Sequence, residues 1–170
     1  MNDNALSDLL ARDLSDAEMD RALLDLTLDA APPAVADAVR VCALPAWFDA
    51  DHLALLTDRE PEEVEDLIEK VAEFSFVLPR EDGGYVYHEA TRERLLDWWR
   101  EPEQVERFRE LSKRFADLYL SLAREFSSRL SGSDYLTALK TLDAIYPNLC
   151  AARHLAVELD DWELMRDSVY

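Results

Sequence analysis

Glycine is scarce in this chain: only three of its 170 residues are glycine. So few glycines cannot build a phosphate-cradling loop, and the pattern Gly-x-x-x-x-Gly-Lys-Ser/Thr does not occur. The chain also lacks Gly-x-Ser-x-Gly, His-Glu-x-x-His and paired-cysteine motifs. These absences disfavour nucleotide hydrolysis and the commoner hydrolytic chemistries. We therefore expect that the chain is not an enzyme and holds no cofactor or metal by itself.

Cysteines and long apolar runs are also scarce. Cys42 and Cys150 stand in helical, apolar surroundings without the spacing of metal ligands. We expect both to be buried free thiols in a reducing cytoplasm. No apolar run approaches the roughly 18 residues of a membrane span, and the first four residues do not resemble a signal peptide. The sequence thus predicts a cytoplasmic protein without a membrane partner.

Basic residues are outnumbered by acidic ones, 18 to 37, which gives a net charge of −19. Such a charge opposes binding to nucleic acid backbones and to anionic membranes. The length allows a real core, and 49% hydrophobic residues with little glycine favour a helical globular protein. We therefore expect a protein partner, or an adjacent domain of the same polypeptide, and no nucleic acid.

The first half of the chain carries local signals for helices. A capping box at Ser15–Glu18 begins the first helix, which ends before Pro32-Pro33. Later helices are expected at residues 34–44, after the N-cap residue Asp49, and from Glu60 to Glu73. The last of these has an apolar stripe at helical spacing, made of Val64, Leu67, Ile68 and Val71.

A hairpin and a further helix follow. Strands are expected at Phe76–Leu78 and Tyr85–Tyr87, with Gly83-Gly84 supplying the positive φ angles of the turn. A helix then opens at His88-Glu89 and ends with Trp98 and Trp99. Three helices followed by a two-stranded wing predict a winged-helix domain at residues 33–100, preceded by a helical lead-in at residues 1–32.

Residues 101–170 are predicted to be helical hairpins. A long amphipathic helix should begin at Pro102 and run past Phe126, with a break at Ser131-Gly132-Ser133. Another helix should begin near Tyr135, Pro147 should open the next, and a last segment should cover residues 162–170. Helices joined by short turns pack as antiparallel neighbours.

The segment Tyr87-His88-Glu89-Ala90-Thr91-Arg92 resembles a known family. It is similar to the winged helix that follows the nucleotide-binding core in signal-transduction ATPases with numerous domains, the NACHT and NB-ARC group. Residues 146–152 and 160–162 resemble the start of the tetratricopeptide-type helical arrays that follow this winged helix in bacterial members, and residues 23–31 resemble its lead-in.

The resemblance implies a regulatory role without catalysis. In the family a His-Asp pair closes the wing and reaches toward bound ADP; here the pair reads His88-Glu89. The segment would relay between a nucleotide-binding core and a repeat sensor, and ADP or ATP would reach it only through a nucleotide-binding domain that this chain lacks. A helix N-terminus also suits an anion near His88. Alternatively, His88 only caps the helix or fills the wing junction.

Other candidate residues leave two further functions open. The outer face of the helix at residues 60–73 is acidic, with Glu62, Glu65 and Glu69, and offers no basic residue except Lys70. Phosphates would be repelled there, so a solvated or protein-binding face is expected rather than a DNA reader or a metal site. The alternatives are a stand-alone helical adaptor and, with less support, a winged-helix DNA-binding transcription regulator.

Aromatic and imidazole side chains complete the set of candidates. Of Trp98 and Trp99, one should pack between the winged helix and the long helix, and the other could meet a partner. His52 and His154 are predicted to be surface residues.

Overall fold

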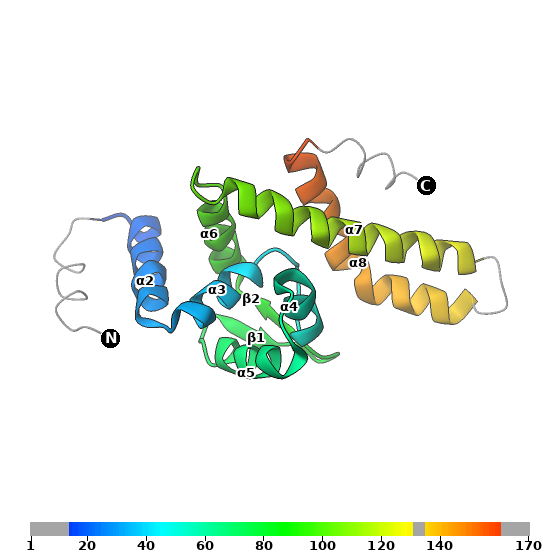
Figure 1. Cartoon of the computed structure of the whole chain (residues 1–170), viewed down its shortest axis with the longest axis horizontal. Helices are drawn as coiled ribbons and strands as arrows, with labels where there is room; N and C mark the ends of the chain where they lie inside the picture. Colours follow the sequence, from blue (N-terminus) through cyan, green and yellow to red (C-terminus); the bar gives the residue numbers. More distant parts are fainter. Residues whose placement is uncertain (1–13, 131–134, 161–170) are drawn as a thin grey trace.

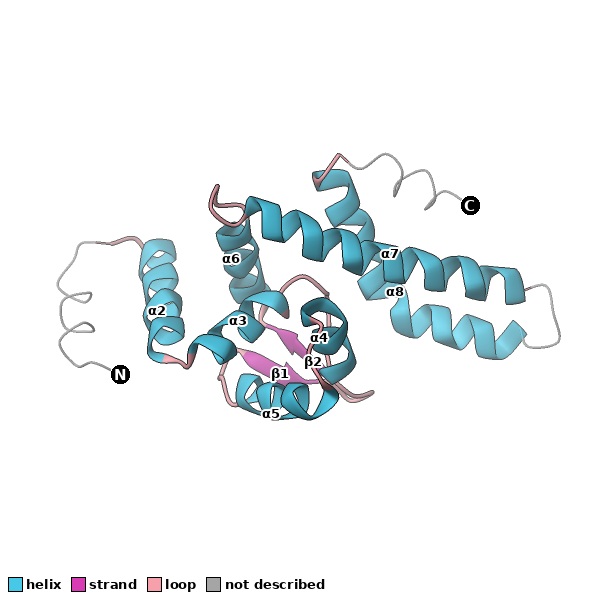
Figure 2. Cartoon of the chain, viewed as in Figure 1, coloured by secondary structure: helices cyan, strands magenta, loops and turns pink. Residues whose placement is uncertain are grey.

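The computed structural model describes residues 14–130 and 135–160. Within them the chain forms seven helices and one small antiparallel sheet of two strands (Figures 1 and 2). In chain order the elements are α2 (Asp16–Ala30), α3 (Pro33–Val41), α4 (Ala50–Thr57), α5 (Pro61–Ala72), β1 (Val77–Pro79), β2 (Tyr85–Tyr87), α6 (Glu89–Trp99), α7 (Val105–Arg129) and α8 (Tyr135–Glu158).

The elements form two packed groups and a flanking helix. Helices α3 to α6 surround the hairpin, whereas α7 and α8 lie side by side as a long antiparallel pair (Figure 1). Helix α2 stands at the opposite end of the molecule from the tips of that pair. The mainly helical fold with one hairpin is as the sequence predicts.

Helix α2 begins where the sequence predicts. The Ser15 backbone N–H donates to Glu18 Oε2 at 2.9 Å, and the Glu18 N–H donates to Ser15 Oγ at 3.4 Å, which completes the capping box. The next helix, α3, carries Pro33 at its first position, where the missing N–H leaves no bond unmade.

The first strand of the hairpin begins one residue later than predicted. Strand β1 begins at Val77, and the pairs are Val77 with Tyr87, Leu78 with Val86, and Pro79 with Tyr85. Phe76 lies just before this ladder, and its carbonyl accepts the N–H of His88 at 3.0 Å, which continues the same register. The first strand was therefore predicted one residue too early.

The turn of the hairpin uses its glycines as expected. Gly83 and Gly84 have φ angles of 99° and 73°, which other residues rarely adopt. A Cβ on Gly84 would lie 2.7 Å from the Phe48 carbonyl oxygen. The Phe48 backbone lies this close to the turn because it pairs with Tyr85. The Phe48 N–H donates to the Tyr85 carbonyl oxygen at 2.9 Å, and the Phe48 carbonyl oxygen accepts the Tyr85 N–H at 2.7 Å. The segment before α4 is thereby fastened to β2.

One continuous core runs through both groups. The predicted stripe of α5 is buried, as are the inner faces of α3, α4 and α7. The largest side chains with almost no exposed surface include Trp99, Phe48, Phe115, Leu44, Leu53, Leu56, Leu95 and Leu120. Because the core is shared, the groups at residues 33–100 and 105–160 are held together by burial of apolar surface.

The predicted helix boundary at Pro147 is wrong. Helix α8 continues through Pro147 from Tyr135 to Glu158. A proline inside a helix removes one backbone hydrogen bond. However, α7 packs along α8, and buried residues lie both before Pro147 (Ala138) and after it (Ala152 and Leu155). Tertiary packing therefore outweighs the local signal.

Helix α7 begins at Val105, after a turn at residues 102–104, and so starts later than Pro102 suggested. The break predicted at residues 131–133 and the segment predicted at 162–170 lie outside the described residues. No described helix combines the length and the apolar composition that a membrane crossing needs.

The two cysteines differ, which corrects the expectation that both are buried. Cys42 lies in the core, where burial raises the pKa of its thiol far above the ordinary value. Cys150 is exposed on α8.

Candidate functional site

His88 stands at the start of α6, as predicted. It is the N-cap residue, its side chain is exposed, and that side chain makes no capping hydrogen bond. The backbone fixes its position: its N–H donates to the Phe76 carbonyl oxygen at 3.0 Å, and its own carbonyl accepts the N–H groups of Thr91 and Arg92 at 3.0 and 2.9 Å. The hairpin and α6 thus present an imidazole that the helix cap does not use.

Glu89 follows in the first turn of α6 and is also exposed. A carboxylate there is stabilised by the positive end of the helix dipole. The pair His88-Glu89 therefore lies on the surface with both side chains open to an approaching group. Whether the pair senses a nucleotide remains a prediction.

The opposite end of α6 is fully engaged. Trp99 has 0% of its surface exposed, and its Nε1–H donates to the Arg40 carbonyl oxygen at 2.7 Å. Its ring stacks on Phe108 of α7, with centroids 6.3 Å apart. Trp99 is thus the tryptophan that packs between the first group of helices and the long helix. Trp98 is half-buried beneath the Arg40 guanidinium, which lies 4.3 Å from the ring centroid. Of these two tryptophans, Trp98 is the one with exposed surface for a partner.

An ion pair extends this engaged end to α8. The Arg100 guanidinium donates to both carboxylate oxygens of Glu158, at 2.6 and 3.1 Å, and also to Asp97 at 2.8 Å. A bidentate pair is geometrically specific. The C-terminal end of α6 is therefore tied to α3, α7 and α8 together.

The acidic face of α5 lies where the sequence placed it. Glu62, Glu65 and Glu69 are exposed, together with Lys70. Within the described part of the chain, no three His, Cys, Asp or Glu side chains come together to hold a metal ion. The face is suited to water or to a protein partner, and its partner role stays a prediction.

The prediction that His52 is a surface residue is wrong, because its side chain is buried. Asp49 caps α4 by accepting the His52 backbone N–H at 3.0 Å, and the same carboxylate oxygen lies 2.6 Å from His52 Nδ1. The other ring nitrogen, Nε2, faces the Tyr119 hydroxyl of α7. His154, by contrast, is exposed as predicted.

Asn148 of α8 completes this buried polar cluster. Its side-chain oxygen accepts the N–H groups of Ala46 and Trp47 at 2.7 and 3.0 Å. Its amide nitrogen donates to the Trp47 carbonyl oxygen at 2.9 Å and to the Tyr119 hydroxyl at 2.7 Å. One side chain thus satisfies three backbone groups of the segment before α4. The side chain of Asn148 is itself shielded, with the residue 0% exposed.

One arrangement of protons satisfies the whole cluster. Asp49 accepts from His52 Nδ1–H, His52 Nε2 accepts from the Tyr119 hydroxyl, and that hydroxyl accepts from Asn148. Burial raises the pKa of Tyr119 to about 12, so the hydroxyl keeps its proton. Burial alone would raise the pKa of Asp49, but hydrogen bonds from His52 outweigh it and lower the pKa overall.

Sequence reasoning missed this cluster. The spacing of Asp49 and His52 at a helix start was the one visible signal, since an N-cap carboxylate can also reach a side chain three residues later. Tyr119 and Asn148 lie far from His52 in the sequence, so no local sequence pattern indicates that the three side chains come together. The cluster links α4, α7 and α8 and makes the two groups of helices one unit.

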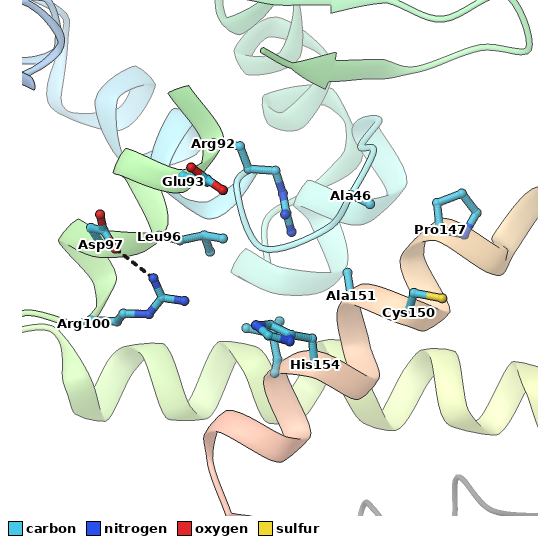
Figure 3. Close-up of a pocket in the computed structure, with 11 residues that line it drawn as sticks. Ala46, Arg92, Glu93, Leu96, Asp97, Arg100, Pro147, Cys150, Ala151 and His154 are labelled. Atoms are coloured by element: carbon cyan, nitrogen blue, oxygen red, sulfur yellow. Dashed lines mark hydrogen bonds and ion pairs between the residues drawn. The ribbon is translucent and has the colours of Figure 1, made fainter. Parts of the chain in front are cut away.

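A groove lies between α6 and α8, with a volume of about 590 Å³. Arg92, Arg100 and His154 point toward the same space in Figure 3, with Ala46 and Pro147 at the far end. Cys150 and Ala151 also line it. A hollow of this size with several converging polar side chains can bind a small ligand.

Comparisons with known proteins give no relative: no family model, no curated protein and no solved structure matches this chain.

Proposed function

We propose that the chain is a regulatory, non-catalytic segment of a signal-transduction ATPase with numerous domains, made of its winged helix and the first helical repeats. One observation carries this proposal: α6 has an exposed histidine at its free end and is locked to α3, α7 and α8 at the other. A rigid helix with one open and one engaged end is suited to relay an event between a nucleotide and a repeat array.

The order of elements supports the winged-helix part of the proposal. Helices α3, α4 and α5 precede the hairpin, and α6 follows it. The Phe48–Tyr85 bridge fastens the segment between α3 and α4 to β2, so helices and hairpin form a single packed unit. In such a domain the hairpin is the wing and His88 lies at its end.

The contacts of α6 support the relay. A phosphate brought to His88 by a neighbouring domain would meet the positive end of the α6 dipole and an imidazole that can donate a hydrogen bond. Any displacement of α6 would be transmitted to Phe108 of α7 through Trp99 and to Glu158 of α8 through Arg100. ADP at one end and a partner at the other would bias the same two-state element.

The outer face of α8 supports the repeat part. Leu136, Tyr146 and Val157 are 70%, 62% and 54% exposed, although large apolar side chains usually gain about 1.5–3 kcal/mol from burial. The three side chains recur at intervals that keep them near one face of the helix. A stacked helix of a repeat array would cover such a face.

The exposed face of α8 also favours a second candidate, a stand-alone helical adaptor. Such a protein would bind its partner through this apolar face or through the acidic face of α5, with Glu62, Glu65 and Glu69. The acidic face speaks against the third function, DNA binding, because base reading and counterion release need basic side chains.

The reading frame of the parent gene separates the candidates. A phosphate-binding loop upstream of this segment would support the ATPase proposal, and a frame without one would favour the adaptor. In a polypeptide that contains the nucleotide-binding core, His88→Ala should loosen ADP and raise basal signalling. Ser75→Ala is the control, since Ser75 is an exposed neighbour that carries no imidazole.

A further inference from the structure

The groove between α6 and α8 contains a basic side chain without an acidic partner. The Nε–H of Arg92 donates to the Pro45 carbonyl oxygen at 3.0 Å, and its Nη2 donates to the Leu44 carbonyl oxygen at 2.8 Å. Arg92 lines the groove, yet no carboxylate of the described residues pairs with it. The remaining nitrogen, Nη1, has no acceptor among the described residues.

The charge of Arg92 is partly shielded from water. Burial and the neighbouring Arg100 lower the pKa of the guanidinium from its ordinary value, and Glu93 offsets only part of that effect. An unpaired charge removed from water is unfavourable. An anion next to Nη1 would offset that loss. The two carbonyl bonds hold the guanidinium in place, so the fork is already oriented for such a ligand.

Two further donors face the same space. His154, from the opposite wall, is exposed and offers an N–H in either tautomer. Arg100 lies at one end of the groove and is held by Glu158 and Asp97. The accessible apolar part of the lining is formed by Ala46, Pro147 and Ala151. The donors therefore come from both helices and lie beside a small apolar surface.

The charges of the lining limit the size of the anion. Glu93 and Asp97 line the same groove as Arg92 and Arg100, so a polyanion would be repelled there by two carboxylates. A single negative charge can still sit against Nη1 of Arg92. The volume, about 590 Å³, falls within the range of pockets for small molecules.

The geometry points to a binding site for a small carboxylic acid with an apolar body, held by Arg92 and His154 across the groove between α6 and α8. The carboxylate would accept from Arg92 Nη1 and from the imidazole, and the apolar body would lie against Ala46, Pro147 and Ala151. A ligand that touches both helices stabilises their packing by mass action. This site stands apart from the proposed function, because binding is measured on the chain alone.

An NMR titration of the whole chain with benzoate tests the site, at constant ionic strength kept with sodium chloride. We expect saturable shifts for the Arg92 side chain, the His154 ring and the backbone of the residues around them. Arg92→Gln should weaken binding by about tenfold, the loss of one charge-assisted hydrogen bond. His154→Ala should weaken it by a smaller factor. Acetate, which lacks the apolar body, should bind more weakly than benzoate.

A matched control is Arg153→Ala, which removes an exposed charge from the neighbouring position outside the groove and should leave the affinity unchanged. If Arg92→Gln unfolds the chain, Arg92→Lys and His154→Ala carry the test. Shifts that do not saturate, an equal loss in Arg153→Ala, or no loss in the groove variants would overturn the proposal. So would inorganic phosphate binding more tightly than benzoate.

Discussion

The two ends of α6 differ in every respect that matters for binding. At the C-terminal end, Trp99 is buried, hydrogen-bonded to Arg40 and stacked on Phe108. At the N-terminal end, His88 is exposed and its side chain leaves the cap unused. The fold therefore concentrates its stabilising contacts at one end and leaves the other accessible. In the proposed relay, a contact made at the free end would act on α7 and α8 through these contacts.

The largest effect should come from removing the engaged end. We expect Trp99→Ala to lower the free energy of unfolding by about 3–5 kcal/mol, since a large buried ring is lost and a cavity remains. Trp98→Ala is the control. It removes a half-buried ring that faces Arg40, and should cost about 1 kcal/mol. Chemical denaturation measures both values, and equal losses would contradict the assignment of Trp99 as the packed tryptophan.

The buried polar cluster should give the next largest effect. Asn148→Ala leaves the N–H groups of Ala46 and Trp47 without their acceptor. A buried group left unsatisfied costs about 1–3 kcal/mol, so we expect a loss of that order in urea unfolding.

Tyr119→Phe separates the roles within the cluster, because it removes the hydroxyl and keeps the ring. Its loss should be smaller than that of Asn148→Ala. The double variant should lose less than the sum of the two, since both side chains belong to one network. Strict additivity would show that the hydrogen bond between them contributes nothing.

Acid should weaken the cluster through Asp49. Burial alone would raise its pKa, but the hydrogen bonds from His52 bring the pKa in the folded chain below its ordinary value of 3.8. A lowered folded pKa means that Asp49 contributes stability above its unfolded pKa and loses this contribution as the pH falls through the folded pKa. Asp49→Asn keeps a good helix cap. Its stability deficit should therefore be largest near pH 7 and shrink below about pH 4; a deficit that does not change with pH would contradict the assignment.

Much of the fold followed from local sequence signals. The capping box at Ser15, the N-cap Asp49 and the glycines of the hairpin each act within a few residues, so a single sequence reveals them. The start of β1 was predicted one residue early, because the register depends on pairing across the turn with β2, which a local pattern does not fix.

The errors in the candidate site have the same origin. Nothing near His52 shows that Tyr119 and Asn148 will surround it, so a polar side chain after an acidic residue was expected at the surface. Pro147 looked like a helix start because the support that α7 gives to α8 is tertiary. Which tryptophan is buried also depends on how α7 packs against α6. No local sequence pattern shows that packing.

The smallest effect on stability should come from His88. His88→Ala should change the free energy of unfolding of this chain by no more than about 0.5 kcal/mol, because the side chain is exposed and caps nothing. The chain alone should bind ADP weakly or not at all, since it lacks a phosphate-binding loop and one imidazole contributes only about 0.5–1.5 kcal/mol.

The most direct test of the account measures ADP release from a polypeptide that joins the nucleotide-binding core to this chain, with and without His88→Ala. If α6 relays from His88, the variant should release ADP faster and signal more strongly in the basal state, while the folding stability of the isolated chain stays the same. Unchanged ADP retention and signalling, together with loss of folding in the isolated chain, would show that His88 is a packing residue and that α6 relays nothing from its free end.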